Sequence, residues 1–340
     1  MKMTNFARTL TRYMSDYLPT QRNVSTNTIK SYRDTFKQLL NYFDEILNIK
    51  PEHLTFEKIT AETIKDFLLW LEKSKGVSIN TRNQRLAAIH SLFRYVQSEN
   101  PEFLLESQRI LGIPFKKREK KSISYLTQEC LKALLQQPNP NTIKGRRDLT
   151  MIATFYDTGA RVQELIDLKA CDVRLTKPAT VLLTGKGNKQ RSVPIMGKTC
   201  TLLEEYMREH YLLENGYQNH PLFFNSNRKP FTRPGVSYIL EKYLKKAKES
   251  YPEMQFPKSL HPHMIRHTKA IHLLEANVNL IYIRDLLGHV NVTTTEIYAR
   301  VNSEVKRKAL EAAYVEVVKQ DIPAWDKDTD LLNWLNDFCR

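Results

Sequence analysis

The sequence predicts a mainly helical α+β protein with two domains and one small β-sheet. Its 340 residues correspond to about two domains of roughly 150 residues each. Residues 1–112 show helical periodicity without strand-like alternation, whereas residues 179–195 carry the clearest strand pattern in the chain. We therefore expect four segments: a helical domain over 1–113, a basic linker over 114–124, a larger domain over 125–318 and a tail over 319–340.

The N-terminal domain is predicted to consist of amphipathic helices. Apolar residues within 25–43 recur at spacings of three and four, and segment 60–74 repeats this pattern behind the candidate caps Thr60 and Thr63. The third helix, 78–99, has a C-terminal half that faces a core. Its polar N-terminal half is expected to present a basic, amide-rich face that carries Arg82, Asn83 and Arg85.

The segment "PFKKREKKSIS" (114–124) is predicted to be an extended linker. Five of the six residues 116–121 are basic, Pro114 precedes them, and no helical or strand period continues through them. Such a run is either a solvated stretch of charge or a segment that lies along a phosphate backbone.

The second domain is expected to begin with helices. Segment 125–137 has Thr127 as its cap, and 146–173 is predicted to hold two helices broken by a turn at Thr158-Gly159. Segment 179–195 then forms a β-hairpin around a Gly-Lys-Gly-Asn turn. Further helices are expected over 198–213, 233–249, 262–276 and 279–287, with a short amphipathic helix in the tail over 328–340.

The charge of the chain indicates a polyanionic partner. Lysine and arginine number 52 against 37 acidic residues, which gives a net charge of +15 and a pI near 9.5. Nucleic acid and an anionic membrane both fit this excess, and a basic protein without such a partner is the third possibility. If the partner is DNA, the candidate contacts are Arg82, Asn83, Arg85, Lys116, Lys117, Arg118, Lys120, Lys121, Lys189 and Arg191.

The sequence argues against several classes of protein. The sequence has no apolar run of about 18 residues, and its first residues lack the apolar core of a signal peptide, so no membrane association is expected. The four cysteines form no C-x-x-C pair, which argues against a zinc ribbon or a disulfide framework. We therefore expect a reduced, cytoplasmic protein.

The helix "PHMIRHTKAIHLL" (262–274) suits an anion. Pro262 fits its first position, and His263 and Arg266 then share a face of the first turn, where unpaired N–H groups also point outward. His263 and His267 have a spacing that metal sites allow, but no H-E-x-x-H motif or carboxylate completes a ligand set. Anion binding, metal binding and residues without a role all remain open from this helix alone.

Three further segments carry chemistry-bearing residues. Arg161 follows a glycine turn at a helix start, with Glu164 three residues on, although a surface ion pair would give the same pattern. Lys186 is expected at the hairpin tip, and the segment lacks the P-loop pattern, so a solvated turn lysine is the alternative. In "LLGHVNVTTTEIYAR" (286–300), His289 precedes Tyr298, a residue that more commonly serves packing, and Thr293 with Glu296 forms a capping-box pattern.

These motifs together resemble the tyrosine recombinase (phage integrase) family. The family order is reproduced over roughly residues 122–302 by "ARVQEL", the hairpin lysine, "HPHMIRHT" and "LLGHVNVTTTEIYA". The helical N-terminal region resembles the core-binding domain of the family through weaker motifs. Segment 260–311 is most similar to recombinases carried by transposons and other mobile elements.

The resemblance implies a catalytic set and a mechanism. Tyr298 would attack a DNA phosphodiester to give a 3′-phosphotyrosyl link. The other implied catalytic residues are Arg161, Lys186, His263, Arg266 and His289, with Glu164 supporting them. Arginine forks suit the non-bridging phosphate oxygens, and no cofactor or metal is implied. The resemblance further implies a C-shaped clamp of two domains around double-stranded DNA, a tetramer on two sites, a tail helix that docks on a neighbouring protomer, and possible accessory recombination proteins.

Two rival functions share parts of this pattern. A type IB topoisomerase would use the same chemistry to relax supercoils as a monomer. A DNA-binding regulator would not need Tyr298, Lys186 and both arginines together, and Tyr298→Phe would leave its activity intact. A metallohydrolase built on His263 and His267 is a more distant alternative, because chelators would then abolish activity.

Overall fold

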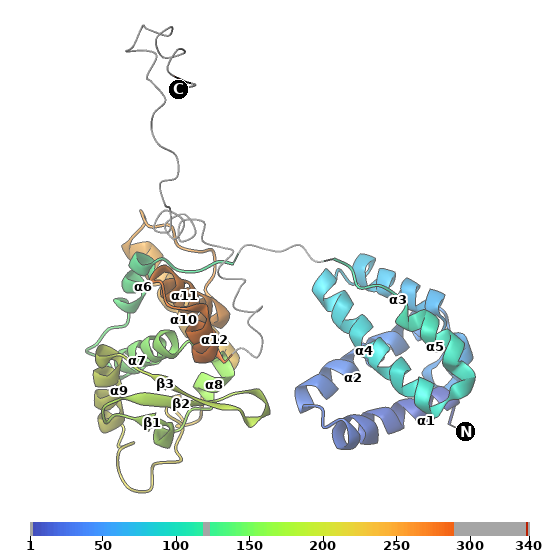
Figure 1. Ribbon diagram of the computed structural model, residues 1–340, viewed down its shortest axis with the longest axis horizontal. Coiled ribbons are helices and arrows are strands. Elements are labelled where there is room, and N and C mark those ends of the chain that lie inside the picture. The colour runs from blue at the N-terminus through green and yellow to red at the C-terminus, as the bar shows by residue number, and fades with distance from the viewer. Residues whose placement is uncertain (1–2, 118–122, 289–337, 339–340) are drawn as a thin grey trace. The chain divides into compact units, whose positions relative to one another are not determined.

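The computed structural model describes residues 3–117, 123–288 and 338. The chain divides into two compact units, Met1–Lys121 and Ser122–Arg340, and each unit has its own hydrophobic core (Figure 1). Both units are mainly helical, and the second contains a three-stranded sheet, which confirms the predicted α+β class.

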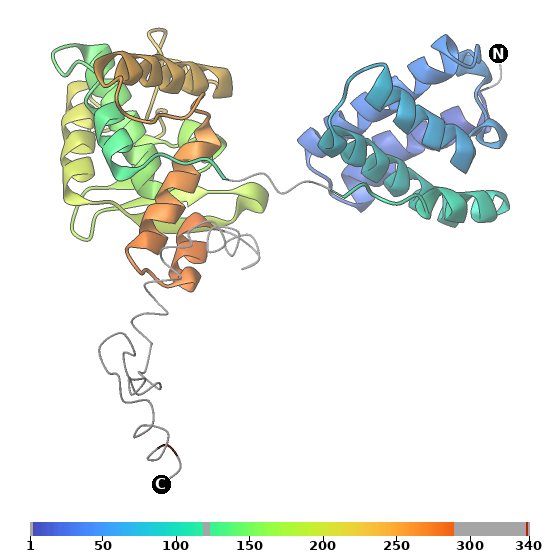
Figure 2. The same ribbon diagram turned by 90° about the horizontal axis from the view of Figure 1, so that it is seen from above.

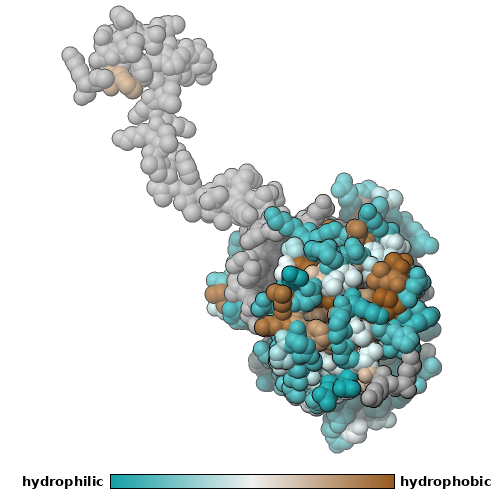
Figure 3. Space-filling view, turned by 90° about the vertical axis from the view of Figure 1, so that its right-hand side faces the viewer, coloured by the Kyte–Doolittle hydropathy of each residue, from teal (hydrophilic) through white to brown (hydrophobic). Residues whose placement is uncertain are grey.

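Unit 1 contains five α-helices among its described residues, 3–117. Their bounds are α1 (Asn5–Arg12), α2 (Thr26–Glu45), α3 (Ala61–Lys73), α4 (Ile79–Glu99) and α5 (Leu104–Leu111), with a π-helical segment at Tyr13–Gln21 and short 3-10 turns at Pro51–His53, Phe56–Lys58 and Pro101–Phe103. Thr60 caps α3 as predicted, because its hydroxyl accepts from the Thr63 N–H. The face of this unit seen in Figure 3 is mostly hydrophilic, with separate small hydrophobic areas.

Unit 2 combines seven described α-helices with the sheet. The helices are α6 (Gln128–Leu135), α7 (Ile143–Thr158), α8 (Val162–Ile166), α9 (Gly197–Glu209), α10 (Arg233–Ser250), α11 (Pro262–Glu275) and α12 (Leu280–Leu287). The strands are β1 (Val173–Arg174), β2 (Thr180–Thr184) and β3 (Gln190–Pro194), antiparallel in the order β1-β2-β3. The predicted cap Thr127 accepts from the Cys130 N–H at the start of α6.

The predicted hairpin is formed by β2 and β3. Val181, Leu183 and Val193 are buried and anchor it on the core of unit 2, while its tip extends away from the helices (Figure 1 and Figure 2). A 3-10 turn at Lys186–Asn188 makes the tip, and the Gly185 N–H donates to the Lys189 carbonyl at 2.8 Å. Lys186 is therefore the second residue of the hairpin loop and the first of its 3-10 turn.

The break after α7 brings two distant segments together. Gly159 adopts a left-handed conformation (φ 55°), and a Cβ on it would lie 2.9 Å from Cδ2 of Leu287 on α12. This glycine lets the α7–α8 turn approach the end of α12. The second helix predicted as far as 173 is wrong beyond Ile166. A 3-10 turn at Ala170–Asp172 follows, held by hydrogen bonds that the Ala170 N–H and the Asp172 carboxylate make.

Candidate active site

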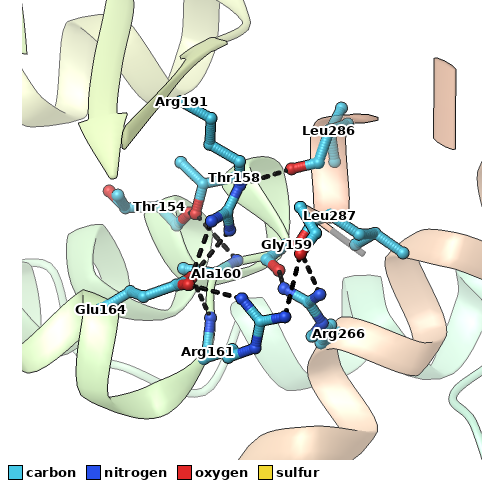
Figure 4. Close-up of polar contacts among 11 residues, drawn as sticks. Thr154, Thr158, Gly159, Ala160, Arg161, Glu164, Arg191, Arg266, Leu286 and Leu287 are labelled. Carbon is cyan, nitrogen blue, oxygen red and sulfur yellow. Dashed lines mark hydrogen bonds and ion pairs between the residues drawn. The ribbon is translucent and has the colours of Figure 1, made fainter. Parts of the chain in front are cut away.

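Two arginines, one from the α7–α8 turn and one from α11, meet at the end of α12 (Figure 4). Arg161 precedes α8 and donates from Nη2 to the Gly288 carbonyl at 3.1 Å. Arg266, on α11, donates from Nη2 to the Leu287 carbonyl at 2.5 Å and from Nη1 to the Gly159 carbonyl at 2.7 Å. Because the two carbonyls are consecutive, the two guanidinium groups lie side by side. The Arg161 side chain is 37% exposed, whereas Arg266 is buried.

Glu164 organises this cluster as a buried carboxylate. Its Oε2 accepts from the Arg161 backbone N–H at 2.7 Å, and its Oε1 accepts from Arg161 Nη1 at 2.7 Å. The Arg191 fork donates to both oxygens, at 3.0 and 2.7 Å. Burial acts to raise the pKa of Glu164, but the hydrogen bonds and charges of the two arginines outweigh it and lower the pKa to about 2. Glu164 is therefore ionised at neutral pH, and the predicted Arg161–Glu164 contact is more than a surface ion pair.

His263 lies at the start of α11, one turn before Arg266. Pro262 is the first residue of this helix, as predicted. The His263 ring stacks on His267, with ring centroids 6.4 Å apart. Partial burial lowers the pKa of His263, and the nearby Arg266, His261 and Arg161 lower it further. A neutral imidazole results, which is the form that can accept a proton.

His267 is the more strongly perturbed of the stacked pair. Burial and then the charge of His263 lower its pKa to about 4, so it stays neutral at physiological pH. Within residues 3–117 and 123–288, no three His, Cys, Asp or Glu side chains are grouped to hold a metal ion.

The hairpin loop begins beside the arginine cluster. A Cβ on Gly185 would lie 3.0 Å from Glu164 Oε1 and 3.7 Å from Arg161 Nη1, so this position admits little beyond a hydrogen atom. Lys186 is the next residue along the chain. The backbone of Lys186 therefore follows directly after the loop residue that packs against the Glu164 carboxylate.

His272, to which the sequence assigned no role, is a packing residue of the second unit. Its Nε2 lies 2.9 Å from the Leu126 carbonyl, which can only accept, so Nδ1 accepts from the Tyr156 hydroxyl at 2.9 Å. Leu126 also donates its N–H to Thr268. These contacts fix the first residues after the linker on α11.

The predicted basic face of α4 is not exposed. Arg82 is 7% exposed and Asn83 is 3% exposed. Asn83 accepts from the Lys116 N–H at 3.1 Å and donates to the Lys116 carbonyl at 2.9 Å, and Arg82 donates to the Pro114 carbonyl at 3.2 Å. Arg85 donates to Ser31 and Thr35 on α2. The expectation of an exposed face is therefore wrong for Arg82 and Asn83, which are buried and hold the start of the linker, while the half-buried Arg85 joins α4 to α2.

The remaining basic candidates differ in exposure. Lys116 and Lys117 are exposed, and Lys116 forms an ion pair with Glu72 at 2.6 Å. Lys189 is exposed on the hairpin, whereas the Arg191 side chain is only 13% exposed and is bound to Glu164. The Arg191 guanidinium thus donates to protein groups in this structure, and its contact with DNA stays a prediction.

Some predicted residues lie outside the described residues, and no geometry is given for them. They are Arg118, Lys120, Lys121, His289, Tyr298, the capping box at Thr293 and Glu296, and the tail helix over 328–340 apart from Phe338. The described helices include none that is long and apolar enough to cross a bilayer.

Family comparisons cover both units. The sequence model of the phage integrase family matches residues 124–304, and that of the N-terminal SAM-like domain of phage integrases matches residues 10–100. The integrase/recombinase y4rC of Sinorhizobium fredii is 36% identical over 91% of this chain and 92% of its own length. The tyrosine recombinase XerC of Bacillus pumilus is 30% identical over 90% and 96%, respectively.

Solved structures share the fold. The XerH site-specific recombinase, in a post-cleavage complex with its difH substrate, matches with a TM-score of 0.66 and 24% identity, over 87% of this chain and 81% of that one. The integrase of transposon Tn1549, in complex with transposon right end DNA, matches with a TM-score of 0.67 and 19% identity, over 88% and 98%, respectively.

Proposed function

The chain belongs to the phage integrase family of tyrosine recombinases, site-specific enzymes that break and rejoin DNA, and we propose that it recombines the DNA of a mobile element through Tyr298. The observation that carries the proposal is the pair of guanidinium groups of Arg161 and Arg266 at the end of α12, one half-exposed and one buried. Two such forks match the two non-bridging oxygens of a phosphodiester.

The proposed reaction has two transesterification steps. The Tyr298 oxygen forms a bond to phosphorus while the bond from phosphorus to the 5′-oxygen breaks, which leaves a 3′-phosphotyrosyl link. His263 takes the tyrosine proton, and Lys186 gives a proton to the leaving 5′-oxygen. A 5′-hydroxyl of the partner strand then reverses the step. The phosphodiester energy is conserved in the link, so no nucleotide cofactor is consumed.

The electrostatic part of the mechanism rests on Arg161 and Arg266. Negative charge develops on the non-bridging oxygens as the tyrosine attacks, and fixed guanidinium groups stabilise it without further reorganisation. His289 adds a hydrogen bond to the same phosphate in this proposal. The lowered pKa of His263 supports its assignment as the proton acceptor, because a neutral imidazole is present at pH 7.

We propose a mobile-element role rather than a chromosomal one. The support for this choice is the resemblance of segment 260–311 to recombinases carried by mobile elements. The XerC relatives support resolution of chromosome dimers as the second candidate. In either role we propose that the protein acts in the cytoplasm as a tetramer on two duplex DNA sites, with its charge of +15 supplying salt-dependent affinity.

A covalent-trapping assay tests the proposed chemistry. Wild type and Tyr298→Phe are mixed with nicked duplexes drawn from DNA that flanks the gene, with a chelator present, and SDS-resistant adducts are collected. Tyr282→Phe is the matched control, because Tyr282 is 68% exposed on α12 and has no assigned role. We expect an adduct from wild type and Tyr282→Phe and none from Tyr298→Phe.

The position of the joint separates the candidate roles. A joint at the border of a mobile element supports integration or excision, and a joint at a chromosomal site supports dimer resolution. Relaxation of a supercoiled plasmid without a preferred site would favour the topoisomerase. An equal adduct yield from wild type and Tyr298→Phe would refute the nucleophile assignment.

A further inference from the structure

Three consecutive carbonyls at the end of α12 each accept a hydrogen bond from a different arginine. Arg191 Nε donates to Leu286 at 2.8 Å, Arg266 to Leu287 at 2.5 Å, and Arg161 to Gly288 at 3.1 Å. The arginines come from β3, α11 and the α7–α8 turn, respectively. The last carbonyls of a helix lack intrahelical partners and carry its negative dipole end. The C-terminal carbonyls of α12 therefore fix the positions of the three guanidinium groups.

All three nitrogen atoms of the Arg191 guanidinium donate hydrogen bonds to protein groups. Its Nε donates to the Leu286 carbonyl, and its Nη1 and Nη2 donate to the two carboxylate oxygens of Glu164. Arg161 also binds both oxygens of Glu164, through its backbone N–H and its Nη1. Glu164 consequently receives four hydrogen bonds, two from each arginine. Both arginines connect this carboxylate to the end of α12, Arg161 through the Gly288 carbonyl and Arg191 through the Leu286 carbonyl.

Gly288 makes room for that connection. It adopts a left-handed conformation (φ 65°), and a Cβ there would lie 3.0 Å from Arg191 Nη1 and 3.2 Å from its Cζ. The guanidinium thus packs directly on the Gly288 backbone, the point from which the chain continues toward His289 and Tyr298.

We infer that Arg191 is a positioning residue. Its hydrogen bonds hold Glu164 and the end of α12 in a fixed relative position, and this in turn fixes the guanidinium groups of Arg161 and Arg266 at the phosphate site. This inference rests on the proposed function for its catalytic consequence, while the fixed arrangement of these groups is a property of the fold. Two alternatives predict different behaviour. A phosphate contact by Arg191 would control DNA affinity, and a purely structural role would change stability without changing the chemistry of bound DNA.

The first test measures cleavage and binding separately in the full-length protein. Arg191→Met, Arg191→Lys and the control Arg208→Met are compared; Arg208 is 68% exposed and pairs with Glu204 on α9. Single-turnover adduct formation is measured on a nicked duplex at saturating protein, and Kd is measured on the intact duplex. We expect Arg191→Met to slow adduct formation about 10- to 100-fold, because small misplacements of positioned groups cost this much. Kd should change less than about threefold, and Arg191→Lys should recover part of the rate.

The pH dependence gives a readout that a purely structural role would not move. Arg161 and Arg191 are the charged groups that hydrogen-bond Glu164 among the described residues. Without Arg191, burial is opposed by one arginine only, so the carboxylate takes up a proton at higher pH. The ratio of wild-type to Arg191→Met rate should then grow as pH falls toward the ordinary carboxyl range near about 4.3. A ratio that stays unchanged from pH 8 down into this carboxyl range would contradict the inference.

Hydrogen exchange tests this fixed arrangement without any cleavage. Arg191→Met should speed exchange at the Arg161 amide, which donates to Glu164, and in the last turn of α12, while Arg208→Met should leave both as in wild type. Gly288→Ala, which displaces the fork from its other side, should reproduce the effect. If wild type forms no adduct, the proposed function fails. The hydrogen-exchange measurement then decides by itself whether Arg191 holds Glu164 and the end of α12 in place. Two results for Arg191→Met would overturn the inference. One is hydrogen exchange as slow as in wild type, and the other is a higher Kd for DNA with a wild-type rate of adduct formation at saturating protein.

Discussion

Replacing Glu164 with glutamine tests how much of the stability of unit 2 depends on one carboxylate. Glu164 is 4% exposed and accepts from both Arg161 and Arg191. Its pKa falls from an ordinary 4.5 to about 2. That difference, at 1.36 kcal/mol per pKa unit, corresponds to about 3 kcal/mol of folding free energy at neutral pH. Removal of one partner from a buried ion pair has a similar cost.

Differential scanning calorimetry of the full chain can measure this loss. For a unit of this size, about 3 kcal/mol lowers Tm by about 6 to 12 °C. Glu204→Gln is the matched control. Glu204 is 47% exposed and pairs with Arg208 across one helical turn, so its replacement should cost about 0.5 kcal/mol or less.

The pH dependence gives the sign of the effect. The folded-state pKa of Glu164 is depressed, so its contribution is fully present above pH 4.5 and is lost as pH falls toward about 2. The Tm difference between wild type and Glu164→Gln should therefore be constant from pH 8 to pH 6 and should narrow as pH approaches 3.5. A difference below about 2 °C at pH 7, or one that stays constant down to pH 3.5, would show that the carboxylate is not held as described.

Three further predictions address the catalytic arginine, a histidine and the linker. Arg266→Lys replaces the fork that binds Gly159 and Leu287, so adduct formation should fall about 10²- to 10³-fold with Kd nearly constant, as trapping and mobility-shift assays can show. The lowered pKa of His263 places the acid limb of the wild-type pH–rate profile below the ordinary imidazole value of 6.5; a midpoint above 6.5 would contradict its role as base. Asn83→Leu removes both hydrogen bonds to the Lys116 backbone, so trypsin should cut after Lys116 about tenfold faster, as mass spectrometry can follow; unchanged cleavage would show that this anchor is dispensable.

The sequence was sufficient to predict the starts, caps and ends of helices, because these depend on residues that are neighbours in the chain. Pro262 begins α11, Thr60 and Thr127 cap their helices, and Gly159 ends α7, all as predicted. Each of these positions is set by hydrogen bonds or backbone angles within a few residues, so a short window of sequence contains the cause.

Contacts between residues far apart in the sequence could not be predicted from the sequence. Arg82 and Asn83 stand in a polar stretch of a helix, and only their partners some 32 and 33 residues away reveal that they are buried. Arg191 looks like an ordinary basic residue of a hairpin, while its partners Glu164 and Leu286 lie 27 and 95 residues away. The polar character of a side chain does not indicate whether water or a distant protein group will satisfy it.

The use of carbonyls rather than carboxylates at the end of α12 has an electrostatic consequence. Arg161, Arg191 and Arg266 bring three positive charges and Glu164 brings one negative charge, so the cluster among the described residues keeps a net charge of +2. The carbonyls of α12 orient all three guanidinium groups through dipoles and cancel none of that charge. A second carboxylate would orient them equally well but would leave less attraction for a singly charged phosphodiester. The arrangement therefore combines fixed geometry with a high local potential, the two conditions for stabilising charge that develops in a transition state.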